Sequence, residues 1–353
     1  MGQGHSSLQV QKAQETKLPL VAQASASLVF VLKLIDNLRF RPFPERQLMA
    51  PIPTNDANQS PIEEKDGWVA EPRVPLSLPT HPVKRWIKVN VGLALSLIFK
   101  SRLASIHAKG SYAALGRLDQ WMVAATAYRA LQNGDDRLSS DILQKFWRSV
   151  EAATWMDGNS RYTEMFLPYH AAIVTPVVEA ARSVDAEKLV EIGCGRGDVL
   201  RHFAEAIPEL ESLTGIDLNP ALLNRAAQIT HDPRVYFVVG DATALIDSLV
   251  KPGTVVLTNG GVYEYWSQDD LRAHFRRLAL LPRVVVALVE PLGSDHNLDV
   301  ETGSRPYGVE ASLSHNYPYL LESFGFDISY SKEIFAGQQR WMMMVARTSI
   351  HSQ

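Results

Sequence analysis

A glycine-rich turn with carboxylates on both sides is the most chemically suggestive feature of this 353-residue sequence. The segment Lys188–Asp198 reads KLVEIGCGRGD, an apolar run that leads directly into the glycines. Glycines at such a turn let backbone N–H groups approach a ligand at the start of a helix. The residues concerned are Glu191, Gly193, Gly195 and Gly197. We therefore expect a ligand at this turn.

The acidic residues beside the turn argue against a dinucleotide as that ligand. A dinucleotide site prefers a third glycine three residues after the second, and Asp198 occupies that position. Its carboxylate would repel a pyrophosphate, which disfavours NAD and FAD. A cationic ligand would tolerate both Glu191 and Asp198.

Two further carboxylates follow at the ends of later apolar runs. Asp217 lies about twenty residues past the glycines, where a carboxylate can accept hydrogen bonds from both hydroxyls of a ribose. Asp241 follows the next apolar run in Gly-Asp-Ala. Either residue alone is equally well explained as a helix N-cap. Both residues follow an apolar run, as the glycine turn does, and this shared position favours a ligand site.

Short apolar runs alternate with helical patterns from Asp185 onward, and these elements must position the residues above. The predicted strands are 188–192, 213–216, 235–239, 254–258, 284–289, 327–335 and 341–346, and the predicted helices are 200–207, 220–229, 242–250 and 267–280. Strands this apolar are typical of a parallel sheet that is buried on both faces. The turn at 336–338 is too short for a crossover, so the last two strands must pair antiparallel.

The expected fold is therefore α/β, with a doubly wound, mostly parallel seven-stranded sheet. It ends in a C-terminal antiparallel strand pair and is preceded by a helical N-terminal region. With this fold and these motifs, the sequence resembles the class I S-adenosylmethionine-dependent methyltransferases of the small-molecule, O-methyltransferase-like type, over about Leu189–Arg347. The resemblance implies S-adenosyl-L-methionine as the cofactor. The cofactor-binding residues that it implies are Glu191, Gly193, Gly195, Gly197, Asp217, Asn219, Asp241, Ala242 and Asn259.

The resemblance also gives these positions roles. The three glycines would line the methionine part of the cofactor, and Glu191 would organise the turn. Asp217 would bind the ribose with Asn219 nearby, while Asp241 and Ala242 would face the adenine. Asn259 ends the fourth predicted strand and would lie where the cofactor meets the methyl acceptor. Cys194, inside the turn, is interpreted as a packing residue.

Three residues are candidates for the catalytic base. The segment after the fourth strand is similar to the His-x-Trp-Ser-Asp segment of small-molecule O-methyltransferases, whose histidine is the general base, but here Glu264 occupies the histidine position. A carboxylate among aromatic residues can have a raised pKa and act as a base, or Glu264 can simply anchor its loop. His170 and His315 are the other candidates, and each is also explained as a lid or helix-cap residue. The long loop from Leu292 to Leu313 is expected to carry binding function.

Composition excludes several classes of protein. The formal net charge is -3 and no basic run is present, so no nucleic-acid partner is expected. The single cysteine allows no intramolecular disulfide and indicates a reducing, cytoplasmic location. No His or Cys cluster has ligand spacing, so no metal is expected.

Proline divides the chain into four predicted regions. These are an N-terminal amphipathic segment at 1–40, a Pro-rich arm or linker at 41–82, a helical region at 83–184 that covers the acceptor, and a cofactor-binding domain at 185–353. A helical apolar stripe at 28–38 is interpreted as packing on the body, with membrane attachment as the alternative. Residues 1–6 fit the loose pattern for myristoylation, but one acyl chain would give only marginal membrane binding, so no stable membrane insertion is expected.

The expected function is transfer of a methyl group from S-adenosylmethionine to a small-molecule acceptor, at oxygen. A protein or nucleic-acid methyltransferase is the alternative within the enzyme class. A non-catalytic subunit that binds S-adenosylmethionine is the alternative outside it. The sequence predicts no oligomeric state.

Overall fold

The computed structural model describes residues 74–158 and 161–348, all within a unit that extends from Lys65 to Gln353. The predicted segment 1–40, the acylation pattern at Gly2 and most of the predicted Pro-rich arm lie outside the described residues. The end of that arm is described, and there Val74, Leu76 and Leu78 are buried. The backbone N–H of Leu78 donates to the carbonyl of Val309 at 2.7 Å.

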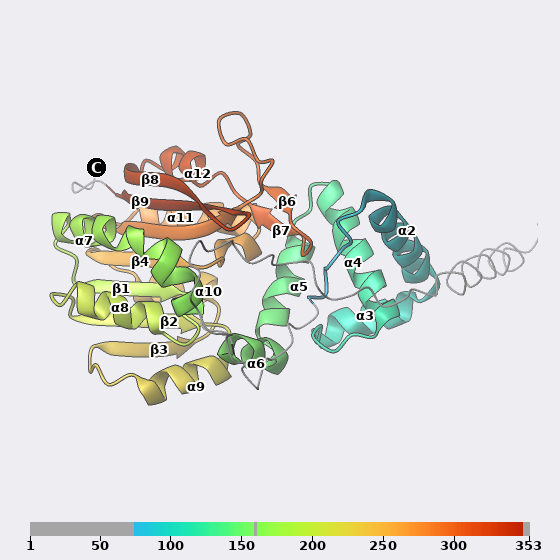
Figure 1. Ribbon diagram of the computed structural model, residues 1–353, viewed down its shortest axis with the longest axis horizontal. Coiled ribbons are helices and arrows are strands. Elements are labelled where there is room, and N and C mark those ends of the chain that lie inside the picture. The colour runs from blue at the N-terminus through green and yellow to red at the C-terminus, as the bar shows by residue number, and fades with distance from the viewer. Residues whose placement is uncertain (1–73, 159–160, 349–353) are drawn as a thin grey trace, which may run out of the picture. The chain divides into compact units, whose positions relative to one another are not determined.

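A seven-stranded sheet forms the core of the C-terminal half (Figure 1). The order of its strands is β3-β2-β1-β4-β5-β9-β8. The strands are β1 Lys188–Ile192, β2 Ser212–Asp217, β3 Val235–Val239, β4 Thr254–Asn259, β5 Val285–Leu292, β8 Asp327–Ala336 and β9 Gln339–Arg347. Strands β1 to β5 are parallel to one another. Strand β9 pairs antiparallel with both β5 and β8. The predicted fold is confirmed.

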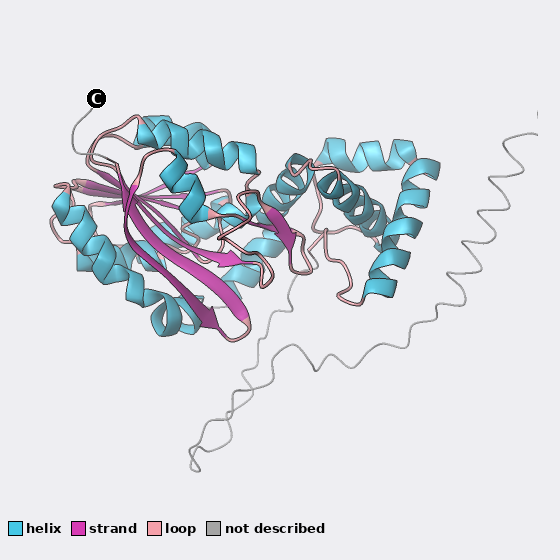
Figure 2. Cartoon of the chain, turned by 90° about the horizontal axis from the view of Figure 1, so that it is seen from above, coloured by secondary structure: helices cyan, strands magenta, loops and turns pink. Residues whose placement is uncertain are grey.

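Helices cover both faces of the sheet, because every central strand is apolar on both sides (Figure 2). On one face, α7 Val174–Ser183 and α8 Asp198–Ala206 pack on β1, β4 and β5. On the other face the sheet packs against three helices, α10 Ala242–Leu249, α11 Gln268–Ala279 and α12 Tyr317–Ser323. The remaining helix of this half, α9 Pro220–Ile229, lies beside β2 and β3. Ser267 caps α11, because its hydroxyl accepts a hydrogen bond from the N–H of Asp270.

Among the described residues, five α-helices precede the connection that leads into α7 and the sheet. They are α2 Pro82–Ile98, α3 Lys100–Lys109, α4 Arg117–Gln132, α5 Arg137–Trp147 and α6 Val150–Gly158. Gly92 lets α2 approach α4 closely, since a Cβ at this position would lie 2.2 Å from the carbonyl oxygen of Trp121. Helix α5 begins at Arg137, so that Ser140 lies inside its first turn, and the Ser140 hydroxyl donates to the carbonyl of Tyr265 at 2.6 Å.

A π-helix, η1 Tyr162–His170, connects these helices to α7 through the short 3₁₀ turn η2 Ala171–Ile173. Helices of this kind are rare and are frequently found at functional sites. A second 3₁₀ turn, η3 Tyr263–Tyr265, follows β4. The predicted loop after β5 contains a hairpin that the sequence pattern did not indicate, formed by β6 Arg305–Tyr307 and β7 Ser312–Ser314.

Within the described residues, no single helix has the length and apolar composition needed to cross a bilayer. Taken together, α2 and α3 meet that criterion of length and composition, but their axes are bent by 97°.

Candidate active site

The glycine turn joins β1 to α8 and contains three glycines with positive φ, Gly193, Gly195 and Gly197. A side chain at Gly193 would collide with Val262, and one at Gly197 would collide with the ring of Phe237. Above Gly195, by contrast, the nearest atom to an added Cβ is Cε of Met156 at 4.0 Å. The turn is therefore packed at its two outer glycines and open at the middle one.

Asp217, the last residue of β2, holds this turn in place. Its Oδ2 accepts the N–H of Gly195 at 2.9 Å, and its Oδ1 accepts the N–H of Asn219 at 2.8 Å. Burial raises the pKa of the carboxyl group, and the hydrogen bonds from these N–H groups partly oppose the shift. Each oxygen keeps a further lone pair, so the carboxylate is still able to accept hydrogen bonds from two hydroxyls.

Asn219 has a different role from the one that the resemblance implied. Its side-chain oxygen caps α9 by accepting from the N–H of Ala221 at 3.1 Å. Its amide group donates both hydrogens, to the carbonyl oxygens of Trp147 at 3.1 Å and Ser149 at 2.9 Å. We therefore assign the Asn219 side chain to helix capping and to attachment of the α5–α6 connection, rather than to the cofactor.

Asp241 and Ala242 lie at the end of β3, where the sequence placed them. Asp241 caps α10, since its Oδ1 accepts from the N–H of Thr243 at 2.9 Å. Its Oδ2 lies 3.8 Å from Nη2 of Arg148, which comes from the end of α5. Asp241 is thus a helix cap whose second oxygen faces the site, and Ala242 is buried beside it.

Glu191 in β1 is buried, and its Oε2 has no hydrogen-bond partner. Burial raises the pKa of this carboxyl well above its ordinary value, and the nearby Asp198 and Asp217 add to the shift. A buried carboxylate oxygen without a partner is costly unless a donor or a cation reaches it. Glu191 therefore has a polar atom left for a ligand or a water molecule, and a cation there would favour its ionised form.

Glu264, in the turn η3, is surrounded by protein donors. Its Oε2 accepts the phenol O–H of Tyr307 from β6, and its Oε1 lies close to Gly261. Burial raises the pKa of this carboxyl, whereas its hydrogen bond with Tyr307 and the charge of Arg161 lower it. These are the contacts of a residue that anchors the β6–β7 hairpin to the loop after β4.

His315 is buried with both ring nitrogens in use. Its Nε2 donates to the carbonyl of Tyr263 at 3.0 Å, so its Nδ1 accepts from the hydroxyl of Ser304 at 2.5 Å. Burial lowers the pKa of the ring to about 4. No lone pair is left to accept a proton from a substrate, so His315 holds the loop rather than serving as a base.

His170 differs from both of these residues. Its Nδ1 lies 3.1 Å from Oδ1 of Asn259 at the end of β4, while its Nε2 is buried and has no partner. Since the amide oxygen accepts, Nδ1 carries the hydrogen and Nε2 presents a lone pair. Burial lowers the pKa of the ring to about 4, so the ring is neutral at neutral pH.

The sequence reasoning missed two residues beside this histidine. Trp341 of β9 packs against His170 with the ring centroids 4.6 Å apart, and its buried Nε1–H is also without a partner. Glu290 of β5 accepts the N–H groups of Val262 at 2.9 Å and Tyr263 at 3.1 Å, which fixes the loop that carries Glu264. Burial raises the pKa of Glu290 to about 8. The sequence offered a signal for Glu290 alone, as an acidic residue that interrupts an apolar strand.

The segment from the end of α5 to η1 crosses the carboxyl ends of several strands. Besides the contacts of Trp147 and Arg148 described above, Arg196 of the glycine turn donates to the carbonyl of Asp157 at 3.3 Å. Arg161 donates to the carbonyl of Gly260 after β4 at 3.0 Å. The segment thus reaches the ends of β1 to β4.

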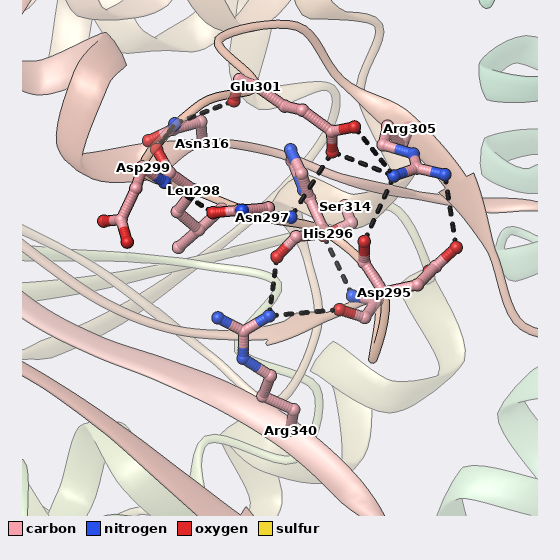
Figure 3. A network of polar contacts seen from close by, with 11 residues as sticks. Asp295, His296, Asn297, Leu298, Asp299, Glu301, Arg305, Ser314, Asn316 and Arg340 are labelled. Carbon is pink, nitrogen blue, oxygen red and sulfur yellow. Dashed lines mark hydrogen bonds and ion pairs between the residues drawn. The ribbon is translucent and has the colours of Figure 1, made fainter.

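The loop after β5 is held by a network of polar contacts rather than being loosely attached (Figure 3). Arg305 of β6 pairs with Asp295 and Glu301, and Arg340 of β9 donates to the carbonyl of His296 at 2.7 Å. Asn316, the N-cap of α12, donates to two carbonyls of the same loop. The loop therefore forms a fixed wall beside β5.

Residues 189–282 match the family model described as a methyltransferase domain. The chain contains a methyltransferase domain. This match confirms the predicted enzyme class and the predicted cofactor, S-adenosylmethionine. No curated protein matches the chain.

Solved structures similar to this chain include three methyltransferases. The magnesium protoporphyrin IX methyltransferase of Synechocystis PCC 6803 with bound S-adenosylhomocysteine has 16% identity and a TM-score of 0.44, and covers 60% of this chain and 100% of its own. The mitomycin 7-O-methyltransferase MmcR has 19% identity and a TM-score of 0.40, and the match covers 77% of this chain and 74% of MmcR. Human N-acetylserotonin methyltransferase in complex with S-adenosylmethionine has 15% identity and a TM-score of 0.38, and the match covers 73% of this chain and 70% of that enzyme. Because these identities and TM-scores are low, the assignment of this chain to the methyltransferases depends on the family match and on the site.

The residues of the methyltransferase domain fit this cofactor. The open position above Gly195 leaves room for a ligand at the turn, and the carboxylate of Asp217 can bind the two ribose hydroxyls. The unpartnered oxygen of Glu191 is left for a donor or a cation, which an ammonium group supplies. When bound, the cofactor supplies an electrophilic methyl group on a sulfonium. Within residues 74–158 and 161–348, no group of three or more His, Cys, Asp or Glu side chains is arranged to hold a metal ion.

Proposed function

We propose that this methyltransferase domain transfers a methyl group to an oxygen atom of a small-molecule acceptor, and that His170 takes the proton from that oxygen. The observation that carries the proposal is the hydrogen bond between His170 Nδ1 and Asn259 Oδ1, which leaves Nε2 as a free lone pair at the end of β4. Oxygen acceptors usually need a base, and a base must have a lone pair within reach of the proton. Of the two histidines among the predicted candidates, His170 is the one with an unused lone pair, and the third candidate, Glu264, is held by the Tyr307 hydroxyl.

Trp341 supports an oxygen acceptor over a nitrogen acceptor. Its Nε1–H is a buried donor without a partner, and its ring packs against the ring of His170, whose Nε2 is a buried acceptor without a partner. A hydroxyl group satisfies both, because its hydrogen is donated to His170 and its oxygen accepts from Trp341. An aliphatic amine is protonated at neutral pH, and in that form it has no lone pair for the indole N–H. The pair is therefore suited to a phenolic or alcoholic hydroxyl.

The lowered pKa of His170 limits which hydroxyl is suitable. A ring with a pKa of about 4 is neutral at neutral pH and available to accept a proton, but it is a weak base. Proton transfer to a weak base is easiest from an acidic hydroxyl. We therefore expect phenolic or enolic acceptors to react faster than simple alcohols.

A small-molecule acceptor agrees with the surroundings of the site. The segment from α5 to η1 crosses the ends of β1 to β4, and the loop after β5 is fixed beside them by Arg305 and Arg340. Such walls enclose an acceptor, whereas a long polymer needs an open path. The names of the similar structures, a porphyrin, a mitomycin and an N-acetylserotonin methyltransferase, describe small-molecule enzymes as well.

The test is radiolabelled methyl transfer by the full-length protein to a panel of phenols, alcohols, carboxylic acids and amines. With the best acceptor, His170→Gln should lower kcat by about 10²–10⁴-fold, the usual contribution of a positioned base, and leave S-adenosylhomocysteine binding nearly unchanged. Glu264→Gln is the matched comparison and should lower kcat by less than about tenfold, because an amide keeps an oxygen for the Tyr307 hydroxyl.

Two outcomes would contradict the proposal. One is methylation of amines alone, which would rule out the oxygen acceptor. The other is full activity of His170→Gln, which would remove His170 from catalysis, and a large loss of kcat in Glu264→Gln would then restore Glu264 as the base.

A further inference from the structure

Helix α2 has an apolar face that no part of the described structure covers. Val83, Trp86 and Leu97 lie along one side of the helix, and 59%, 67% and 67% of their surfaces are exposed. The opposite side packs on α4, where Gly92 lies against the backbone of Trp121. A soluble helix normally turns its apolar side toward the core. Here α2 has apolar side chains on both sides, and the outer ones face solvent.

The exposed apolar side chains continue around the bend between α2 and α3. Ile98 and Phe99 occupy the corner and are 46% and 43% exposed, and the two helices meet there at 97°. No residue of α3 is buried. Together, Val83, Trp86, Leu97, Ile98 and Phe99 form what we call the α2–α3 surface. Large exposed apolar side chains gathered on neighbouring helices in this way mark a site of interaction.

The charged residues of the segment that forms this surface have one sign. From Val74 to Leu118 the sequence contains seven Lys or Arg residues and not one Asp or Glu, whereas the remainder of the chain has 28 basic and 38 acidic residues. Part of this charge is used internally, since Arg102 pairs with Asp119 and Lys88 donates to the carbonyl of Ser77. Lys100 and Lys109, at the two ends of α3, are exposed. The apolar residues of the α2–α3 surface therefore belong to a basic segment of a protein whose net charge is negative.

We propose that the α2–α3 surface binds peripherally to an anionic lipid surface. Tryptophan and long aliphatic side chains beside lysines and arginines are the composition of helices that lie in a membrane interface, with the apolar side chains at the acyl boundary and the cations at the headgroups. Because α2 and α3 carry no acidic side chain of their own, neither helix adds a repulsion that would oppose anionic lipids. Figure 1 places α2 and α3 at the side of the helical region that is remote from the sheet, so that docking leaves the carboxyl ends of the strands accessible.

The test is flotation of the full-length protein with vesicles of phosphatidylcholine containing about 30% phosphatidylglycerol, compared with phosphatidylcholine alone. We expect binding to the anionic vesicles and loss of most of it at high salt. Lys100→Glu/Lys109→Glu should weaken binding at least tenfold, because each cation near an anionic surface contributes about fivefold. Trp86→Ser/Leu97→Ser should weaken it to a similar extent by removing the inserted side chains.

Matched variants elsewhere control for general effects of exposed apolar and charged residues. Leu280→Ser removes a leucine that is 79% exposed after α11, and Lys332→Glu reverses an exposed charge on β8. Both should bind vesicles as the unaltered protein does. Unchanged circular dichroism and S-adenosylhomocysteine affinity would show that all variants are folded.

Three results would overturn the proposal. The first is a protein that stays with the unbound fraction at every anionic lipid content. The second is vesicle binding that the α2–α3 variants leave unchanged, which would assign it to residues outside this surface. The third is a dimer in solution that Trp86→Ser/Leu97→Ser dissociates, which would make a second copy of the chain the occupant.

Discussion

His170 and Asn259, which are 89 residues apart in the sequence, form a hydrogen-bonded pair with Nδ1 and Oδ1 3.1 Å apart. The histidine ends the π-helix before the sheet, and the asparagine ends β4. Since Asn259 is uncharged, it fixes the ring without adding the negative charge that would raise its pKa. The pair therefore sets both the direction of Nε2 and the pH range over which it is a free base.

Asn259→Asp tests this relationship. A carboxylate at this position would raise the pKa of His170 above about 4, and the acid limb of the kcat/KM profile should move up by about 1–2 pH units. Asn259→Leu removes the partner without adding charge and should lower kcat without moving that limb upward. Profiles of the same shape in both variants would show that His170 does not control the rate. Affinity for S-adenosylhomocysteine, measured in parallel, separates loss of cofactor from loss of the base.

Asp217→Ala should weaken S-adenosylhomocysteine binding about tenfold to a hundredfold, or ~1.5–3 kcal/mol, because charge-assisted hydrogen bonds to the ribose are lost. The glycine turn also loses the acceptor of the Gly195 N–H. Asp217→Asn keeps one acceptor oxygen and should lie between the alanine variant and the unaltered protein. Calorimetry that shows the same affinity for all three would refute the ribose assignment.

Gly195→Ala should abolish most cofactor binding, with only a modest loss of stability. The φ of +52° costs an alanine about 1 kcal/mol, and the added Cβ would occupy the open space above the turn. Gly134→Ala is the matched control, because its φ is +80° and nothing lies within 4 Å of the added Cβ. We expect a similar loss of stability in both variants and at least a tenfold loss of affinity in Gly195→Ala alone. Equal affinities would mean that the cofactor does not approach Gly195.

His274, buried in α11 with its Nε2 2.9 Å from the Tyr263 hydroxyl, should make stability depend on pH. Burial lowers its pKa to about 3, so that below about pH 6.5 the unfolded chain takes up a proton that the folded protein excludes. This contribution is complete above pH 6.5 and decreases by up to ~1.4 kcal/mol per pH unit as the pH falls toward 3.

The measurement is urea unfolding of the unaltered protein and of His274→Gln between about pH 5 and pH 7. Glutamine binds no proton. The unfolding free energy of the unaltered protein should therefore fall by about 2 kcal/mol relative to that of His274→Gln as the pH is lowered from about 7 to about 5. Parallel curves would show that His274 titrates alike in the folded and unfolded states. Because buried carboxyls such as Glu290 have raised pKa values and act in the opposite direction, the comparison between variants is more informative than either curve alone.

The sequence by itself determined the sheet and the place of the glycine turn and Asp217 in it. Continuous apolar runs can be buried only in a covered parallel sheet, and β1 and β3 occupy the same residues that the pattern predicted. The glycine turn and Asp217 are local features at strand ends, and parallel strands necessarily bring such ends to one edge. Their mutual contact, through the Gly195 N–H, follows from that topology.

The roles of the other polar residues were decided only by the tertiary structure. Glu264, His170 and His315 were equivalent candidates in the sequence, because whether a nitrogen or oxygen is free depends on partners that are far away in the chain. The hydroxyl of Tyr307 donates to Glu264, and that of Ser304 donates to His315. The side chain of Asn219 donates to the backbone carbonyl of Trp147. Asn259 instead orients His170 and leaves its second nitrogen free. Hydrogen-bond satisfaction is a property of the packed molecule, since each buried polar atom is paired by whichever segment the fold brings against it.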